Sequence, residues 1–423
     1  MKDALLRTIS PEEIPLVRRG PVDSDSLAVA RPIVEDVRQR GETALREHAE
    51  RLGDIGPNGQ LYFTPDELEA ELEALPGDER QLLERTAQRI RAFAVAQRKS
   101  IKPIEIAVPG GRAGQTIAPV ERAGCYAPGG RFPLPSSVLM TAITARVAGV
   151  EEIWVASPKP AKATLAAAAL AGAKGLLAAG GAQAIAALAY GAGPVSSCDV
   201  VVGPGNRFVT AAKQLVAGSV AIDMLAGPSE LVVLADGSAD ARLVACDLLA
   251  QAEHDPCAVP ILVTADRQVV SAVNTELQRQ LADLPSRENV RAALGNGFAV
   301  VASNLDAAIE VCDRLAPEHL ELMVDDADAV ALRVRHYGAL FVGAGSAQVL
   351  GDYGAGPNHT LPTGGAARHT GGLSVLNFLR VRTWLKIDDP ESAMPLVRDA
   401  EGLALIEGLG GHACSARMRA QSR

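Results

Sequence analysis

The fold class is indicated most clearly by the stretch of residues 152–202, which reads EIWVASPKPAKATLAAAALAGAKGLLAAGGAQAIAALAYGAGPVSSCDVVV. Three short apolar runs in it are expected to form strands, at 152–156, 175–178 and 198–202. The Ala-rich segments between these runs are expected to be helices that begin near Ala161 and Gln183. Strands that alternate with helices in this way are typical of a parallel sheet covered by helices on both faces.

The same alternation resumes after Pro228. Further strands are expected at 230–235, 259–264, 298–302 and 339–342. Helical periodicity also marks three segments near the ends of the chain, 24–52, 78–100 and 390–410. We therefore predict an α/β protein with two Rossmann-like parallel-sheet domains and small helical appendages at the N- and C-termini.

Composition excludes several classes of protein. The chain has 423 residues and a formal net charge of −9, and no segment combines clustered Lys and Arg with aromatic residues. A nucleic-acid partner is therefore not expected. No signal peptide and no window of about 20 uncharged apolar residues is present, so a membrane span is not expected either. The six cysteines are scattered and form no CxxC pair, which is typical of reduced thiols in a cytoplasmic protein.

The usual nucleotide-binding signatures are missing. Neither GxGxxG nor the Walker A motif occurs in the sequence. If the protein uses a dinucleotide, it does not hold the pyrophosphate in the common Rossmann manner.

Two pairs of residues are candidates for chemistry. Gln251 and His254 are three positions apart at the end of a predicted helix and share one face of it, which suits a metal accepting mixed N and O ligands. A capping or surface role is the alternative. Glu318 and His319 follow Pro317 and could act as acid–base groups on one pocket only if the backbone there is irregular. The alternative is a surface Glu beside a partly exposed His.

Two further segments add candidates. The stretch GDYGAGPNHTLPTGG, residues 351–365, is too rich in Gly and Pro for a helix or an ordinary strand, and it carries Asp352 and His359. Such loops bring backbone close to ligands. Near the C-terminus, Glu407 and His412 follow a predicted helix, where they could equally serve as a helix C-cap.

Together these segments resemble the histidinol dehydrogenase family, the enzymes of the last two steps of histidine biosynthesis. The resemblance covers nearly the whole chain, in the family's order. Its motifs are RAGCYAPGGR (122–131), PLPSSVLM (133–140), GGAQAIAAL (180–188), GPGN (203–206), AGPSE (226–230), QAEH (251–254), APEHLE (316–321), GDY (351–353) and GPNH (356–359).

The resemblance implies roles for individual residues. It implies one zinc ion per subunit, with the ligands Gln251, His254, Asp352 and His412, which would also hold the substrate. Glu318 and His319 would be the catalytic acid–base pair. The remaining substrate contacts would be Ser229, His319, His359 and Glu407. The NAD contacts would be Tyr126, Gln183 and Asn206.

The resemblance also implies a reaction and an assembly. L-Histidinol would be oxidised to L-histidine through L-histidinaldehyde, with two NAD⁺ reduced in succession. In the family the active site lies at the interface of a homodimer, so Glu407 and His412 would serve the partner's site. Zinc would orient the substrate while the protein bases move protons.

Four segments follow from this interpretation. Residues 21–100 would be the helical appendage, and 125–228 the second α/β domain, which binds NAD. The first α/β domain would hold the metal and the substrate and would be discontinuous, comprising 1–20, 101–124 and 229–372. Residues 373–423 would form a C-terminal dimerisation tail.

Two features leave alternatives open. Gln348 stands where many members carry Glu. This difference could weaken a contact between this side chain and the predicted metal ligands that it would support. The stretch 364–379 is somewhat similar to relatives that oxidise other alcohols, such as a sulfopropanediol. A catalytically silent zinc- or nucleotide-binding protein is the non-enzymatic alternative, against which the presence of both Glu318 and His319 argues.

Overall fold

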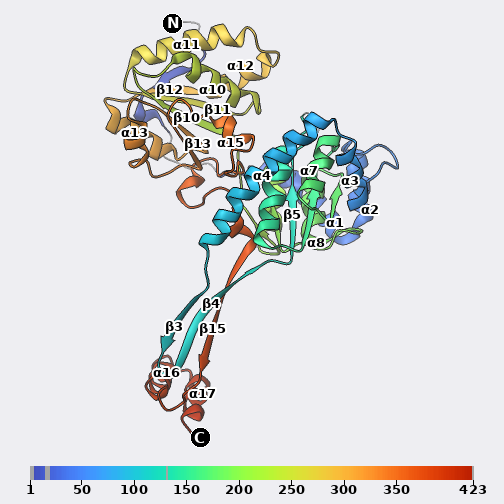
Figure 1. Cartoon of the computed structure of the whole chain (residues 1–423), viewed down its shortest axis with the longest axis vertical. Coiled ribbons are helices and arrows are strands. Elements are labelled where there is room, and N and C mark those ends of the chain that lie inside the picture. The colour runs from blue at the N-terminus through green and yellow to red at the C-terminus, as the bar shows by residue number, and fades with distance from the viewer. Residues whose placement is uncertain (1–3, 15–19, 130–131, 422–423) are drawn as a thin grey trace.

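The chain forms two α/β lobes and a long arm (Figure 1). The computed structural model describes residues 4–14, 20–129 and 132–421. The lobes lie side by side, and the arm extends from their junction to the C-terminus. Among the described residues, no helix combines the length and the apolar character needed to cross a membrane. All six cysteines are free thiols, as predicted.

The first lobe is built on a six-stranded parallel sheet in the order β1-β12-β11-β10-β13-β14. Its strands are β1 (Arg7–Ile9), β10 (Glu230–Ala235), β11 (Val259–Thr264), β12 (Phe298–Val301), β13 (His319–Met323) and β14 (Ala339–Val342). Its helices are α10 (Ala241–Glu253), α11 (Arg267–Leu281), α12 (Arg287–Asn296), α13 (Leu305–Leu315), α14 (Ala327–Ala331) and α15 (Gln348–Asp352). Separate apolar clusters pack on its two faces, as expected for a sheet covered on both sides.

The second lobe is built on a six-stranded sheet in the order β2-β7-β6-β5-β8-β9. Its strands are β2 (Tyr62–Phe63), β5 (Arg122–Tyr126), β6 (Glu152–Ala156), β7 (Gly175–Leu177), β8 (Val200–Val202) and β9 (Ala221–Ile222). All neighbours are parallel except the edge strand β2, which pairs antiparallel with β7. Its helices are α5 (Pro135–Val138), a π-helical turn (Leu139–Ile143), α6 (Thr144–Ala148), α7 (Lys162–Leu170), α8 (Gly181–Tyr190) and α9 (Arg207–Val216).

The N-terminal helices pack on the second lobe. They are α1 (Ser24–Arg40), α2 (Glu42–Arg51), α3 (Pro65–Glu73) and α4 (Gly77–Ser100). The side chain of Asp23 caps α1 by accepting from the backbone N–H of Ser26. Helix α1 lies against α8 and α9, α3 lies against α7, and α4 lies against α6. The chain from Ser24 to Ser100 is therefore mainly helical, and it also supplies the edge strand β2.

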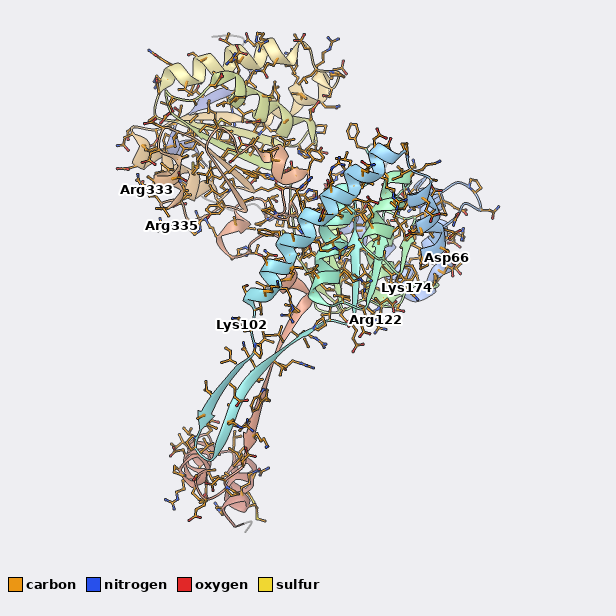
Figure 2. All side chains as sticks on the ribbon, in the orientation of Figure 1. Asp66, Lys102, Arg122, Lys174, Arg333 and Arg335 are labelled. Carbon is orange, nitrogen blue, oxygen red and sulfur yellow. The ribbon has the colours of Figure 1, made fainter. Side chains whose placement is uncertain are left out.

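The arm is a three-stranded antiparallel sheet capped by two helices. Its strands are β3 (Ile104–Val108), β4 (Gly111–Pro119) and β15 (Leu379–Ile387), in the order β15-β4-β3. Its tip carries α16 (Met394–Ile406) and α17 (Gly410–Gln421) (Figure 1). Figure 2 places Lys102 where the chain leaves α4 for the arm. The parallel sheets and terminal helices confirm the predicted α/β class with helices at both ends, and the Rossmann-like character of the two domains stays a prediction. The antiparallel arm was not predicted from the sequence.

Short 3₁₀ turns complete the connections. They are Pro11–Glu13, Ala366–Arg368 and Val375–Phe378. The last of these precedes β15, and the backbone N–H of Val120 donates to the carbonyl of Phe378 where β4 and β15 reach the second lobe. The four segment boundaries predicted from the sequence stay a prediction.

Candidate active site

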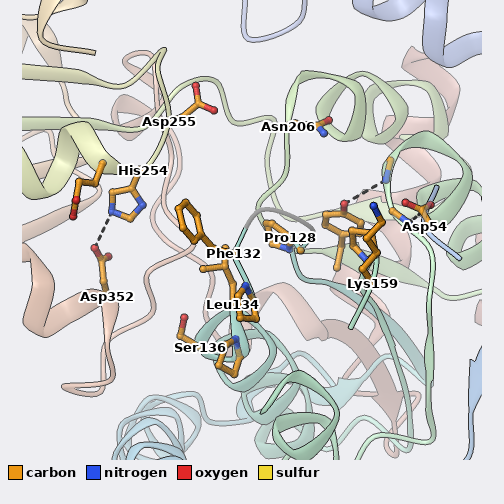
Figure 3. A pocket seen from close by; sticks show the side chains of 18 of the residues that line it. Asp54, Pro128, Phe132, Leu134, Ser136, Lys159, Asn206, His254, Asp255 and Asp352 are labelled. Atoms are coloured by element: carbon orange, nitrogen blue, oxygen red, sulfur yellow. Dashed lines mark hydrogen bonds and ion pairs between the residues drawn. The ribbon is translucent and has the colours of Figure 1, made fainter. Parts of the chain in front are cut away.

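A cleft of about 1380 Å³ is lined by residues from both lobes. On the first lobe it is lined by the ends of α10 and α15, including His254 and Asp352. On the second lobe it is lined by the loops after β5 and β6 and by the start of α8. Figure 3 shows His254 and Asp352 on one side and Asp54 and Lys159 on the other. The carboxyl ends of parallel strands, where both loops lie, are the usual place for a ligand site.

The end of α10 positions Gln251 and His254. Asp255 and Pro256 follow the helix, and His254 is its C-terminal cap residue. Gln251 lies three residues earlier on the same helical face and is fully buried. The Nε2 atom of His254 lies 3.5 Å from Oδ2 of Asp352. The geometry therefore brings His254 and Asp352 together at one end of the cleft, with Gln251 one helical turn before His254.

Asp352 is held by two neighbours. Gln348, one helical turn earlier, donates from Nε2 to Oδ2 of Asp352 at 3.1 Å. The backbone N–H of Gln348 donates to Oε1 of Glu321 at 2.6 Å. His359 donates from Nδ1 to the backbone carbonyl of Asp352 at 2.9 Å, which leaves its Nε2 3.4 Å from the hydroxyl oxygen of Ser137. Gln348 therefore contacts the predicted ligand Asp352 directly, and whether Gln weakens this contact relative to Glu stays a prediction.

The Glu318–His319 pair lies at the start of β13. Ala316 has a φ of 47°, so the chain turns sharply before the strand begins at His319. This turn is the irregular backbone that allows Glu318 and His319 to face one pocket. The side chains of both residues are buried. The hydroxyl of Ser229 donates to Oε2 of Glu318 at 2.5 Å. The backbone N–H of Glu230 donates to the same oxygen at 2.9 Å.

The imidazole of His319 is fixed from two directions. Its Nδ1 lies 3.0 Å from the backbone carbonyl of Glu230, to which only a protonated Nδ1 can donate. The ring stacks on Phe341 with centroids 6.1 Å apart. The Nε2 atom is buried without a hydrogen-bond partner among the described residues and lies 3.6 Å from Oδ1 of Asp352. In the neutral ring the lone pair of Nε2 faces Asp352, and in the protonated ring Nε2–H forms an ion pair with that carboxylate.

Burial and charge shift the pKa values of this cluster. Burial opposes the charge on His319, but the Glu318 and Asp352 carboxylates outweigh it and raise the pKa of His319 to about 9. Burial raises the pKa of Glu318. For Asp352 burial acts in the same direction, yet His254 and His319 hold its pKa below the usual value. Burial lowers the pKa of His359, so this ring is neutral.

The residues present fit a divalent metal with mixed ligands. Both amide atoms of Gln251, Oε1 and Nε2, are buried without a hydrogen-bond partner among the residues that the structure describes. An unpaired buried amide is costly, and coordination by its oxygen would remove the cost. Imidazole nitrogen and carboxylate oxygen from His254 and Asp352 are common zinc ligands. In the described part of the chain, no three His, Cys, Asp or Glu side chains form a metal-binding cluster.

The fourth predicted ligand is remote from the cleft. His412 lies in α17 and Glu407 ends α16, both at the tip of the arm (Figure 1). They line a small cavity of about 350 Å³ between these two helices. Within one chain, the structure does not bring Glu407 and His412 to the other site residues.

The predicted NAD contacts lie on the second lobe. The hydroxyl of Tyr126 accepts from the backbone N–H of Gly181 at 3.3 Å. Asn206 caps α9, with its Oδ1 accepting from the backbone N–H groups of Phe208 and Val209 at 3.0 and 3.2 Å. Both residues, and Gln183 of α8, line the cleft. The structure therefore brings all three to the lobe opposite His254 and Asp352.

One buried ion pair near this lobe was not foreseen from the sequence. Lys213 of α9 pairs with Asp223, and both side chains are almost fully buried. Lys213 donates to the carbonyl of Gly203 at 3.0 Å, and Asp223 accepts from the backbone N–H of Gly203 at 2.8 Å. The pair thus fixes the loop that leads to Asn206. A lysine ten residues from an aspartate gives no local signal, because only the folded chain brings them together.

Replacing Lys213 with Met is expected to lower the free energy of unfolding by about 3–5 kcal/mol, because Asp223 would remain buried without its counter-ion. Urea unfolding followed by circular dichroism measures this loss. Arg242→Met is the control, since the pair of Arg242 with Asp240 is exposed and should contribute about 1 kcal/mol or less. Equal losses in the two variants would contradict a structural role for the buried pair.

Comparisons with known proteins agree with this geometry. The sequence profile of the family described as histidinol dehydrogenase matches residues 17–420. The histidinol dehydrogenase of Thermus thermophilus is 46% identical over 393 residues, which cover 92% of this chain and 94% of that protein. That of a Synechococcus species is 43% identical over 402 residues, with 93% and 92% covered.

A solved structure gives the same result. The crystal structure of histidinol dehydrogenase from Elizabethkingia anophelis superposes with a TM-score of 0.91 at 30% sequence identity. The superposition covers 99% of this chain and 98% of that one. The profile, the relatives and the superposition each span nearly the full length. This chain is therefore an oxidoreductase that belongs to the histidinol dehydrogenase family.

Proposed function

We propose that the protein oxidises L-histidinol to L-histidine through L-histidinaldehyde, using zinc and two NAD⁺ per turnover. The observation that carries this proposal is the buried Glu318–His319 pair, in which Nε2 of His319 lies 3.6 Å from Oδ1 of the proposed ligand Asp352. Membership of the family supports the substrate. Conversion of an alcohol to a carboxylate removes four electrons, which requires two hydride acceptors in succession.

We assign the metal ligands as Gln251, His254 and Asp352 of one chain and His412 of the other. When bound, zinc would hold the substrate's imidazole and amino groups and so fix the carbon that is oxidised. The unpaired amide of Gln251 and the 3.5 Å separation between Nε2 of His254 and Oδ2 of Asp352 support this set. Of the remaining substrate contacts, Ser229 already bonds to Glu318, and His359 is fixed beside Asp352.

His319 is suited to act as the base for the alcohol. Its Nδ1–H is engaged by the carbonyl of Glu230, so Nε2 is the atom that accepts a proton. Burial excludes bulk water from this nitrogen, and stacking on Phe341 keeps the ring from rotating. Proton removal from the hydroxyl would accompany hydride loss from the carbon in the first step. The same nitrogen could accept the proton from the aldehyde hydrate in the second.

Glu318 is suited to activate water for hydration of the aldehyde. Ser229 and the N–H of Glu230 both donate to Oε2, which leaves Oε1 able to accept a proton. Burial raises the pKa of Glu318 and so makes its carboxylate a stronger base than an exposed one. On this assignment Glu318 serves the second oxidation, and His319 serves both.

Glu318→Gln is therefore expected to slow aldehyde oxidation about 10²-fold or more while slowing alcohol oxidation by less than about tenfold. The two steps are measured separately, as NADH formed from L-histidinaldehyde and as single-turnover hydride transfer from L-histidinol. Glu310→Gln, on α13 away from the cleft, is the matched control and should leave both rates unchanged. An equal loss in the two steps would show that the division of labour is wrong.

We further propose a homodimer in which Glu407 and His412 reach the partner's cleft. The support is that Glu407 and His412 lie at the tip of the arm, away from the cleft of their own chain, and that this tip exposes apolar side chains. Leu403 is 61% exposed and Ile406 is 84% exposed, although neither has a polar group that water would solvate. The arm is similarly uncovered at Ile106 and Leu385. The six free thiols also support a reducing compartment such as the cytoplasm.

NADH formation with L-histidinol, compared with a sulfopropanediol, tests the proposed substrate. We expect turnover with L-histidinol only, loss of activity after treatment with a chelator, and recovery on addition of Zn²⁺. Absence of histidinol turnover by the zinc-loaded protein would refute the proposal. Turnover of the diol instead would assign the protein to a different alcohol, and no NADH with either would favour a silent binding protein.

A further inference from the structure

Asp54 lies in the cleft although no catalytic role has been assigned to it. It belongs to the turn that follows α2, where its backbone N–H donates to the carbonyl of Ala49 at 2.8 Å. Its carboxylate oxygen Oδ2 accepts from the backbone N–H of Gly180 and from Nε2 of Gln183, both at 2.8 Å. Figure 3 shows Asp54 on the side of the cleft opposite His254. The N-terminal helical segment thus contributes a carboxylate to the second lobe.

This carboxylate occupies the N-terminus of α8. The free N–H groups at a helix N-terminus commonly bind an anion such as a phosphate. Here the N–H of Gly180 is taken by Asp54, and the N–H of Gly181 is taken by the hydroxyl of Tyr126. A second anion at this position would meet the negative charge of Asp54. The N-terminus of α8 therefore offers a phosphate neither of these two N–H groups.

The same contact determines how Gln183 is presented. Because Nε2 donates to Asp54, the amide can adopt only one of its two orientations. Its Oε1 atom is then buried without a hydrogen-bond partner among the described residues, in a side chain that is 1% exposed and lines the cleft. An unpaired buried acceptor is costly unless a donor arrives with a ligand. Hydroxyl and carboxamide groups of a dinucleotide are donors of this kind.

We propose that Asp54 is a positioning residue for the cofactor. It fills the anion position at α8 and locks the Gln183 amide so that Oε1 accepts from the bound dinucleotide. This inference rests on the proposed function only in taking NAD as the ligand of this lobe. It does not depend on which alcohol is oxidised.

Asp54→Ala is expected to raise the KM for NAD⁺ about tenfold, with kcat at saturating NAD⁺ and the KM for histidinol within about twofold of the wild type. Asp54→Asn should restore the KM for NAD⁺, because the Asn oxygen can accept the same two hydrogen bonds. Asp66→Ala is the matched control, a carboxylate of the same segment on the outer side of the second lobe (Figure 2). If Asp54→Ala fails to fold, Asp54→Ser replaces it, since its hydroxyl is too short to reach both donors.

Equilibrium binding of NADH to the zinc-loaded full chain separates this inference from the proposed reaction. Weaker NADH binding by Asp54→Ala supports the inference even if the wild type does not oxidise histidinol. A double variant with Gln183→Ala should bind no more weakly than Gln183→Ala alone, because Asp54 acts through that amide. Additive losses, wild-type affinity in Asp54→Ala, no rescue by Asn, or no NADH binding by the wild type would each overturn the inference.

Discussion

Replacing His319 with Asn is expected to lower kcat by about 10²- to 10⁴-fold for both oxidation steps, the range typical for loss of a general base. Asn has no group that accepts a proton near neutral pH, but its size lets it keep the contact with the carbonyl of Glu230. The bound metal should be unaffected, because His319 is not one of the assigned ligands. Steady-state kinetics and metal analysis of the same sample test both statements.

The pH profile gives a second measure of the role of His319. A base acts in its neutral form, so kcat of the wild type should rise with pH as His319 loses its proton. The nearby carboxylates raise the pKa of His319 to about 9, which places this rise on the alkaline side of neutrality until a cation engages Asp352. In His319→Asn the rise should disappear. His336→Asn is the control, because His336 lies outside the cleft and should leave both kcat and its pH profile unchanged.

The repeating part of the fold could be predicted from the sequence because its signal is local. The strands β6, β10 and β11 are short apolar runs between helical segments, and their predicted positions agree with the structure. The arm could not be predicted in this way. Its strands β4 and β15 are more than 250 residues apart and pair in register only in the folded chain. In one chain the side chains of β15 are mostly exposed and those of β4 are mostly half-buried, so neither strand has the apolar run that marks a buried strand.

For the candidate site too, some features could be predicted from the sequence and others could not. Gln251 and His254 share a helical face, a relation that spacing alone predicts. Local sequence also indicated the Glu318–His319 pair, the loop 351–365 and the C-terminal Glu407 and His412, and the resemblance added Ser229 and the NAD contacts. The contacts that hold them were not predictable. Gln348 reaches Glu321 and Asp352 together, and Asp54 reaches Gln183 across 129 positions. These contacts depend on how separate elements pack, and no periodicity in the sequence records that packing.

Mixing His254→Ala with His412→Ala chains is expected to restore about one quarter of wild-type activity, although each variant alone should be nearly inactive. If His412 acts across the interface, a heterodimer has one site with both ligands intact and one site with neither. Random exchange makes about half of the dimers mixed, and half of their sites are whole. The recovered activity is measured after the chains are unfolded together and refolded with zinc.

A matched pair of variants distinguishes complementation from mere stabilisation. His254→Ala and Asp352→Ala both alter the same end of the cleft within one chain, where Nε2 and Oδ2 lie 3.5 Å apart. No heterodimer of these two has an intact site, so their mixture should remain inactive. In one chain His412 lies at the tip of the arm, remote from the cleft (Figure 1). If the first mixture also stayed inactive while dimers formed, the exposed arm would have to be explained without an exchange of His412.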